Sequence, residues 1–206
     1  MNLRDTNLEL ERLIACTAKL AAAGLTPATS SNFSIRADAH SCLITVSGRD
    51  KGRLAADDFM RVDSLGNALD PDRTASAETL LHTQIYRERS DAGAVLHTHS
   101  LAQTLLSMRH AQDGFIEIKN YELLKAFHGI KTHDTAIRIP IIANSQDMSA
   151  LCAAIAPAFA EQAFWGYLIA GHGLYTWGRD VEEAHRHLDA FEFLLTAEMT
   201  KLGFRA

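Results

Sequence analysis

Two histidines separated by one residue, His97 and His99, end an apolar run that begins at residue 92. Side chains two apart on a β-strand point to the same face of a sheet, so both imidazoles would face one point. Imidazole is the commonest metal ligand in proteins, and two that converge form half of a zinc site. Two histidines that only form hydrogen bonds in a core would explain this pair about equally well.

A third histidine, His172, follows another apolar run at residues 166–170 and lies between Gly171 and Gly173. Glycine lets the backbone approach a ligand closely, because it has no side chain. Three histidine ligands with an open fourth position are typical of catalytic zinc rather than of structural zinc. The sequence therefore favours one zinc ion per chain, held by these three histidines.

Short segments rich in hydroxyl and amide groups occur at residues 30–34, at Ser47-Gly48 and at Ser76. Such groups suit a phosphate, together with backbone N–H groups at turns and helix starts. Each segment alone is explained more simply as a turn, because Ser, Asn and Gly are ordinary loop residues. The phosphate interpretation gains weight only because three such segments accompany a metal motif.

Two glutamates in mostly apolar surroundings, Glu78 and Glu122, are candidates for general acid–base catalysis beside a metal. Glu78 falls in the first turn of a predicted helix, where the helix dipole favours a carboxylate whatever its function. Glu122 precedes Lys125 by three residues, and these two side chains would pair on a solvated helix face. For each glutamate the structural explanation stays open beside the catalytic one.

Another pair with the same spacing, His185 and His187, lies in a predicted helix. Residues two apart on a helix are separated by about 200° around its axis and cannot share a metal ion. We expect both histidines on the surface.

The bulk properties fit a single domain over residues 1–206, with 47% hydrophobic and 22% charged residues. A formal net charge of −5 argues against nucleic acid as the main partner. Three cysteines, Cys16, Cys42 and Cys152, are far apart, which predicts neither disulfides nor a thiolate metal site. We find no signal-peptide pattern and no apolar run of about 20 residues, so we expect a cytoplasmic protein without membrane contact.

Hydrophobic periodicity and turn residues predict helices interleaved with strands. The predicted helices span residues 8–21, 76–89, 101–109, 119–128, 147–155 and 181–202. The predicted strands span residues 42–46, 59–62, 92–97, 136–142, 166–170 and 175–177. Residues 29–34 are predicted as a polar loop. This alternation indicates a mixed α/β structure in layers.

These motifs together resemble the class II aldolase/adducin family over nearly the whole chain. The matching elements are Ser31-Asn32-Phe33-Ser34, Ser47-Gly48, Ser76-Ala77-Glu78, His97-Thr98-His99-Ser100 and His172-Gly173. The resemblance implies an α/β fold, a layered α/β/α domain around a central, mostly antiparallel sheet. It also implies a homotetramer with active sites near the subunit contacts.

The resemblance further implies a role for each candidate residue. It places zinc on His97, His99 and His172, and the substrate phosphate on Asn32, Ser47, Gly48 and Ser76. In the sugar-phosphate aldolases of the family, the carboxylate at the position of Glu78 is the acid–base group. In a dehydratase branch, the catalytic group is the glutamate at the position of Glu122. This sequence carries both.

Within the family, the similarity is greatest to that dehydratase branch. It is carried by Tyr121-Glu122-Leu123-Leu124-Lys125-Ala126, Gly129, Thr132-His133, residues 140–147 and residues 173–178. The implied activity is zinc-dependent loss of water from 5-methylthioribulose 1-phosphate, with Glu122 protonating the hydroxyl that leaves C4. The alternatives are a class II aldolase or pentulose-phosphate 4-epimerase, and a non-catalytic interaction module like the adducin branch.

Overall fold

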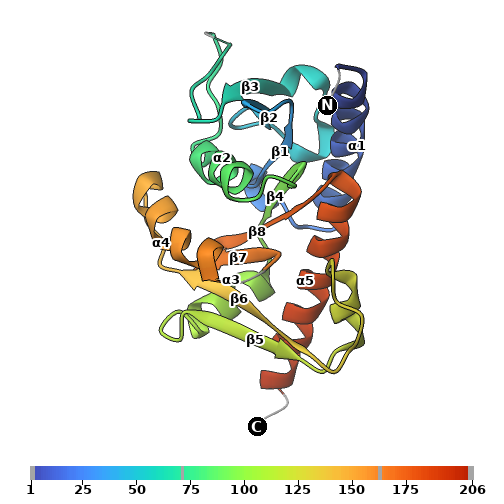
Figure 1. The fold of residues 1–206 in the computed structure, drawn as a ribbon, viewed down its shortest axis with the longest axis vertical. Helices are drawn as coiled ribbons and strands as arrows, with labels where there is room; N and C mark the ends of the chain where they lie inside the picture. The colour runs from blue at the N-terminus through green and yellow to red at the C-terminus, as the bar shows by residue number, and fades with distance from the viewer. Residues whose placement is uncertain (1–2, 71, 162–163, 204–206) are drawn as a thin grey trace. The chain divides into compact units, whose positions relative to one another are not determined.

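The computed structural model describes residues 3–70, 72–161 and 164–203 of the chain. The α-helices are α1 (Leu3–Ala22), α2 (Thr79–Glu88), α3 (Leu101–Arg109), α4 (Met148–Glu161) and α5 (Val181–Gly203). The strands are β1 (Asn32–Arg36), β2 (Ser41–Thr45), β3 (Phe59–Asp63), β4 (Ala94–Thr98), β5 (Phe115–Lys119), β6 (Ala136–Ile142), β7 (Gly166–Ile169) and β8 (Gly173–Gly178). Short 3₁₀ turns are η1 (Pro27–Thr29), η2 (Lys51–Arg53), η3 (Ala56–Asp58) and η4 (Glu122–Ala126). Figure 1 shows these elements along the chain.

The eight strands follow the order β3-β2-β1-β4-β8-β7-β6-β5 in one sheet. Neighbours pair antiparallel from β3 through β4, as do β5 with β6 and β7 with β8, whereas β6 and β7 are parallel. The predicted α/β fold with a central, mostly antiparallel sheet is confirmed. The chain divides into two compact units, which are described in turn.

The first unit comprises Met1–Thr98 and Trp177–His185. In its sheet, β1 lies between β2 and β4, and helix α1 packs against β1 and η2. Apolar side chains of the strands and of α2 are fully buried, namely Phe33, Ile35, Ile44, Met60, Val62, Leu81 and Ile85. This core holds β1 and α2 in a fixed relation, and both elements carry candidate site residues.

The second unit comprises His99–Thr176 and Arg186–Ala206. Helix α3 packs against β7, and α4 packs against β6. Aromatic rings fill much of the core. Phe127 lies 4.6 Å from Phe191 between ring centroids, and Tyr167 stacks on Tyr175 at 5.2 Å. This packing fixes β7 and β8, the two strands joined by the turn that carries His172.

Two glycines of the first unit lie where the backbone leaves no room for a side chain. The N–H of Gly93 donates to the carbonyl oxygen of Gly178 at 2.8 Å. A Cβ on Gly93 would collide with the carbonyl oxygen of Arg179, and one on Gly178 would collide with the backbone of Ala184. This close approach joins the start of β4 to the entrance of α5.

Two of the differences from the sequence prediction concern strands. Residues 29–34 are not a loop throughout, because β1 begins at Asn32. Its polar residues, Asn32 and Ser34, are buried against polar partners on α2, which hydropathy alone does not reveal. Strand β5 is absent from the prediction, although Phe-Ile-Glu-Ile-Lys alternates in burial as a half-exposed strand does.

Two other differences concern helices. In place of a helix over residues 119–128, the structure has β5 ending at Lys119 and only the short turn η4. His187 is 2% exposed and packs on Phe127 at 5.6 Å, so the prediction of a surface position is wrong for His187. The prediction fails because α5 is buried on more than one face in this part of the chain.

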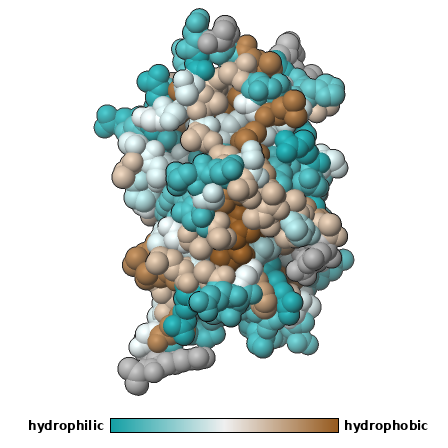
Figure 2. Space-filling model, turned by 90° about the vertical axis from the view of Figure 1, so that its left-hand side faces the viewer, coloured by the Kyte–Doolittle hydropathy of each residue, from teal (hydrophilic) through white to brown (hydrophobic). Residues whose placement is uncertain are grey.

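Figure 2 shows hydrophilic side chains over much of one face of the molecule, with hydrophobic ones among them. Large apolar side chains that are exposed include Leu65, Leu101, Met108 and Phe193. Within residues 3–70, 72–161 and 164–203, no helix combines the length and the apolar character that crossing a membrane requires.

Candidate metal centre and its surroundings

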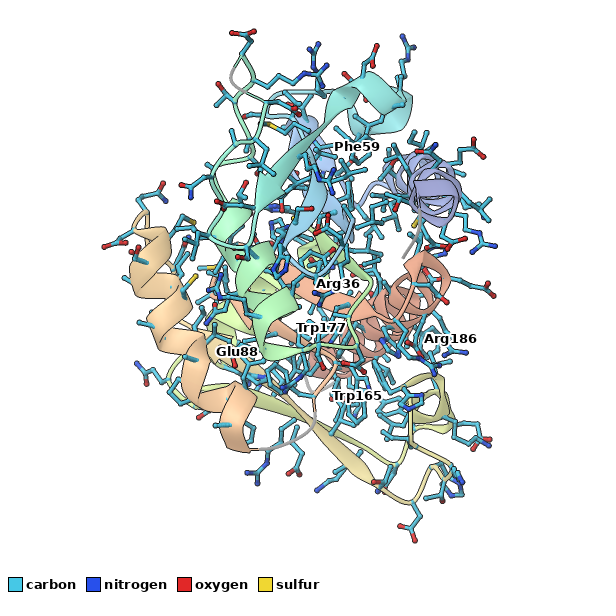
Figure 3. The ribbon with its side chains drawn as sticks, turned by 45° about the horizontal axis from the view of Figure 1, so that its top comes forward. Arg36, Phe59, Glu88, Trp165, Trp177 and Arg186 are labelled. Carbon is cyan, nitrogen blue, oxygen red and sulfur yellow. The ribbon has the colours of Figure 1, made fainter. Side chains whose placement is uncertain are left out.

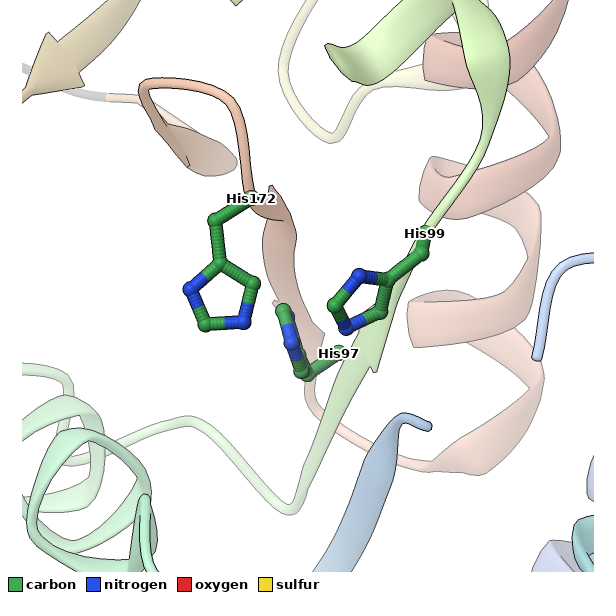
Figure 4. Close-up of side chains that lie close together, drawn as sticks. All are labelled: His97, His99 and His172. Carbon is green, nitrogen blue, oxygen red and sulfur yellow. The ribbon is translucent and has the colours of Figure 1, made fainter. Parts of the chain in front are cut away.

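Three histidine side chains converge in the structure, as the sequence predicts (Figure 4). His97 is on β4 and fully buried, His99 follows that strand, and His172 is in the turn between β7 and β8. One nitrogen from each ring lies within 4.8 Å of the other two. The rings of His99 and His172 have centroids 4.9 Å apart.

This donor set fits a divalent transition metal. A zinc–nitrogen bond is about 2.0–2.1 Å, so nitrogens sharing one tetrahedral ion lie roughly 3.4 Å apart. The nitrogens that the structure brings together lie within 4.8 Å of one another, so binding an ion would draw them closer. Imidazole nitrogens suit zinc and iron, whereas manganese prefers oxygen ligands.

The turn that carries His172 is held by side chains of α3. The N–H of Gly171 donates to Ser107 Oγ at 3.0 Å, and the N–H of Leu174 donates to Gln103 Oε1 at 3.2 Å. Gly171 has a φ of +68°, which glycine adopts without strain. The position of the imidazole is therefore fixed on both sides of the turn.

His99 is positioned through the residue that follows it. Ser100 caps α3 by accepting the N–H of Gln103 at 3.2 Å, and its hydroxyl donates to Glu192 Oε2 at 2.9 Å. Gln103 Nε2 donates to the same oxygen at 2.9 Å. Ser100 belongs to a motif visible in the sequence, whereas Gln103 and Glu192 give no such signal because their partners are distant along the chain.

Glu78 is the carboxylate that the structure places against His97, one of the predicted metal ligands. Its Oε2 lies 3.3 Å from His97 Nε2 and accepts Asn32 Nδ2 at 2.9 Å. Glu78 occupies the N-cap position of α2, but its side chain makes no capping hydrogen bond. Its orientation toward the histidine is therefore not explained by helix capping.

The predicted phosphate ligands gather around the same end of α2. Val46 forms a bridge with Ala75, which brings Ser47-Gly48 beside the segment that carries Ser76. The N–H of Ser47 donates to the carbonyl oxygen of Thr74 at 3.5 Å. Asn32 is opposite His97 in the sheet and 5% exposed. The first unit thus brings all four predicted phosphate ligands close to the start of one helix.

A buried lysine outside the predicted site residues supports this corner. Lys51 is 3% exposed, and its ammonium donates to the carbonyl oxygens of Thr29 and Arg49, at 3.1 and 2.8 Å. Burial lowers the pKa of Lys51. The ammonium ties together the loops that precede Asn32 and follow Gly48. A lone lysine between loops gives no spacing signal in a sequence.

Glu122 has very different surroundings. It forms an ion pair with Lys125, and His133 Nδ1 lies 3.5 Å from its Oε2, while its side chain is 70% exposed. Hydrogen bonding by Lys125 holds the pKa of Glu122 below its usual range. The group of possible metal ligands found among the described residues comprises the three histidines and does not include Glu122.

The family model for the class II aldolase and adducin N-terminal domain matches residues 11–199. The methylthioribulose-1-phosphate dehydratase of Xanthomonas campestris pv. campestris (strain 8004) is 54% identical over 194 residues. That match covers 94% of this chain and 89% of the relative. The protein of the same name from Xylella fastidiosa (strain 9a5c) is 53% identical over 193 residues, which are 94% of this chain and 88% of that one.

Among solved structures, the L-fuculose-1-phosphate aldolase from Thermus thermophilus matches with a TM-score of 0.75. The two sequences are 25% identical, and the match covers 98% of this chain and 99% of the aldolase.

Proposed function

The chain belongs to the class II aldolase and adducin family, and we propose that it is a methylthioribulose-1-phosphate dehydratase, a lyase of methionine salvage. It would remove water from 5-methylthioribulose 1-phosphate to give 2,3-diketo-5-methylthiopentyl 1-phosphate. Two relatives more than half identical to this chain over almost its full length carry that name. The observation in the structure that best supports the proposal is the converging group of His97, His99 and His172.

These three histidines would hold one zinc ion per subunit. When bound there, zinc would supply Lewis-acid chemistry that stabilises negative charge on the carbonyl oxygen of the substrate. The protein must then do three things with its own residues. It must hold the phosphate, remove the proton from C3, and protonate the hydroxyl that leaves C4.

We assign phosphate binding to Asn32, Ser47, Gly48 and Ser76. Their neutral donors and the start of α2 suit an anion, because backbone N–H groups there are directed outward. The Asn32 side chain uses one amide hydrogen to bond Glu78 and its oxygen to bond His82. Its second amide hydrogen is available to a ligand. Replacing Ser76 with Asp places a negative charge beside the phosphate. It should raise KM about tenfold, the effect of roughly 1.4 kcal/mol of repulsion.

We assign proton transfer to the two glutamates. Glu78 is the proposed base at C3, since its carboxylate lies 3.3 Å from the proposed metal ligand His97. Glu122 is the proposed acid at C4, the role that its Tyr-Glu-Leu segment implies. Because Lys125 pairs with Glu122 and lowers its pKa, Glu122 must lose this partner and take up a proton, such as the one removed from C3, before it can act as an acid. The exposed position of Glu122 suits a contact with a second subunit. We propose that the chain forms a homotetramer.

We further propose that residues 1–206 act as one domain in the cytoplasm. The substrate is a small phosphorylated ketose, and no nucleic acid or membrane is required as a partner. The net charge of −5 agrees with a small-molecule enzyme rather than with a nucleic-acid-binding protein.

The decisive experiment is product analysis with the purified, zinc-loaded chain. Incubation with 5-methylthioribulose 1-phosphate should give a product lighter by one water, detected by mass spectrometry. Fuculose 1-phosphate and ribulose 5-phosphate serve as controls for aldol cleavage and for epimerisation. Turnover of either control, without dehydration of the methylthio substrate, would replace the proposal with an aldolase or epimerase. A chain that binds no metal and turns over none of the three would favour the non-catalytic interaction module.

A further inference from the structure

A buried row of polar side chains runs inward from Glu78 between β1 and α2. Asn32 Nδ2 donates to Glu78, and Asn32 Oδ1 is in turn hydrogen-bonded to His82 Nε2. His82 Nδ1 is 2.8 Å from Ser34 Oγ, which is 2.8 Å from the hydroxyl of Tyr86. Ser34 and His82 are fully buried, so this row has no contact with solvent at its centre.

Two backbone periodicities produce this row. Asn32 and Ser34 are two apart on β1 and therefore share one face of the strand. Glu78, His82 and Tyr86 are four apart and share one face at the start and along the length of α2. The row forms because a polar face of the strand meets a polar face of the helix.

Arg36, the next residue on the same face of β1, fixes the far end of this contact (Figure 3). Its guanidinium donates to the carbonyl oxygens of Tyr86, Arg89 and Ala92, at distances from 2.7 to 3.0 Å. It also lies over the Tyr86 ring, 4.8 Å from the centroid. Helix and strand are thus clamped beyond the row, and the polar side chains inside have little freedom to move.

The chemistry of the groups fixes the direction of every hydrogen bond. The Glu78 carboxylate can only accept, so Asn32 turns its NH₂ group toward Glu78 and its Oδ1 toward His82, and His82 Nε2 must therefore carry a proton. Burial lowers the pKa of His82 to about 3, so the ring is neutral and its Nδ1 is an acceptor. The Ser34 hydroxyl then donates to Nδ1, and the Tyr86 hydroxyl donates to Ser34. Every hydrogen bond of the row therefore donates in the same direction, from Tyr86 toward the Glu78 carboxylate.

The imidazole favours the same orientation of the Asn32 amide from the other side. With His82 donating from Nε2, the amide oxygen must face the imidazole and the NH₂ group must face Glu78. A flipped amide would place two N–H donors against each other and an oxygen against the carboxylate. The imidazole therefore reinforces the rotamer in which Asn32 holds the Glu78 carboxylate beside His97.

We infer that His82 is a positioning residue that orients the Glu78 carboxylate through Asn32. This role rests on the proposed function, in which Glu78 acts at C3 of the substrate. Nothing about His82 marks it in the sequence, because it is one of ten histidines and lies mid-helix. It acts without contact to substrate or metal, through one amide.

Two isosteric variants separate positioning from packing. Gln in place of His82 puts an amide nitrogen where Nε2 stands, whereas Asn reaches only as far as Nδ1. His82→Asn should lower kcat about 10–100-fold, the usual cost of losing a residue that orients an active group. KM should stay within about threefold, since the group acts on the chemical step. His82→Gln should restore most of kcat.

Two neighbouring variants are the matched controls. Leu81→Ala removes a fully buried side chain from the same turn of α2, so it should lower Tm but leave kcat of the folded enzyme unchanged. Tyr86→Phe removes only the last donor of the row and should change kcat less than His82→Asn does. If Leu81→Ala lowers kcat as much as His82→Asn, or if Gln fails to rescue, the positioning role is wrong.

The imidazole itself offers a test that needs no substrate. In the zinc-loaded enzyme, ¹⁵N NMR of the ring that disappears in His82→Gln should show a neutral Nε2–H tautomer at pH 5. A protonated ring or an Nδ1–H tautomer would overturn the inference, whatever the enzyme catalyses. Conversely, the expected tautomer in an enzyme that fails to dehydrate methylthioribulose phosphate would leave the row intact and refute the proposed function.

Discussion

The two candidate catalytic glutamates occupy opposite kinds of environment. Glu78 is held by Asn32 beside His97, and the row of polar groups behind it is buried. Glu122 is 70% exposed, and its side chain pairs with Lys125 and His133 on the surface. One carboxylate is oriented by the core of its unit, whereas the other is free to change partners.

This contrast separates two demands of an elimination. A base that takes a proton from carbon needs a fixed position, because the rate of proton transfer depends steeply on geometry. An acid that protonates the leaving hydroxyl needs no fixed position in the free enzyme, because it has to reach the hydroxyl only after substrate binds. A rigid base and a mobile acid fit these demands, and the following predictions can break or sharpen that division.

The largest effect should come from the histidine cluster, on which both glutamates depend. His172→Ala should abolish metal binding and activity while the metal-free protein keeps its Tm, since this side chain lies in a partly exposed turn. His97→Ala should abolish both and also lower Tm, because His97 is fully buried. Metal analysis and calorimetry measure these effects, and a variant that retains one zinc per chain would contradict the ligand assignment.

Replacing each glutamate by glutamine tests the division directly. Loss of a general acid or base typically costs about 10²–10⁴-fold in rate, so Glu78→Gln and Glu122→Gln should each lower kcat by that order with zinc retained. Exchange of the C3 proton with deuterated solvent distinguishes the two. It should stop in Glu78→Gln and persist in Glu122→Gln. The reverse pattern would exchange the two roles.

The buried row predicts a pH dependence of stability between pH 5 and 7, above the range in which a carboxylate such as Glu122 titrates. His82 has a pKa of about 3 when folded, against 6.5 for the free side chain, so the unfolded state binds more protons between these values. The contribution of His82 to stability is therefore fully present above pH 6.5 and falls as the pH decreases toward 3, by about 1.4 kcal/mol per pH unit.

Urea unfolding of metal-free protein at pH 7 and pH 5 measures this loss. His82→Gln removes the titrating group, so its stability should fall less over the same interval. Equal losses in the two proteins would show that His82 does not titrate as its burial implies.

The smallest effect should come from Lys125→Met. This change removes the hydrogen bond that lowers the pKa of Glu122, so the pKa should rise toward its ordinary value. Tm should not change measurably, because exposed ion pairs contribute little to stability. A ¹³C NMR titration of the carboxyl group measures the pKa. A large fall in Tm would mean that the Glu122 environment is more rigid than its exposure suggests.

The parts of the site that the sequence predicts are those whose spacing is local. His97 and His99 are two apart on a strand, and the apolar runs before them and before His172 mark strands in the sequence itself. The sheet and the long helices are predictable for the same reason, since hydrophobic periodicity reports which face is buried. The 3₁₀ turn at Glu122 is too short to show that periodicity reliably, and a helix is predicted there instead.

The parts that could not be predicted depend on which elements pack together. Ser34 and Asn32 resemble loop residues because their polarity suggests solvent, whereas the structure gives them partners on α2. His82 bonds to Ser34, 48 positions away, and Lys51 reaches back 22 positions to Thr29, so no local pattern marks these contacts. A single sequence does not show that a polar residue is buried unless the element that supplies its hydrogen-bond partner is known.

The close approach of Gly93 and Gly178 has a consequence for any survey of mutational tolerance. Every side chain at either position meets backbone atoms that cannot move aside, so alanine should be rejected as firmly as tryptophan. In a scan of all single substitutions scored by growth, both glycines would rank with the three histidines. Scoring protein abundance in parallel would separate them, since the histidine variants accumulate without activity and the glycine variants do not accumulate.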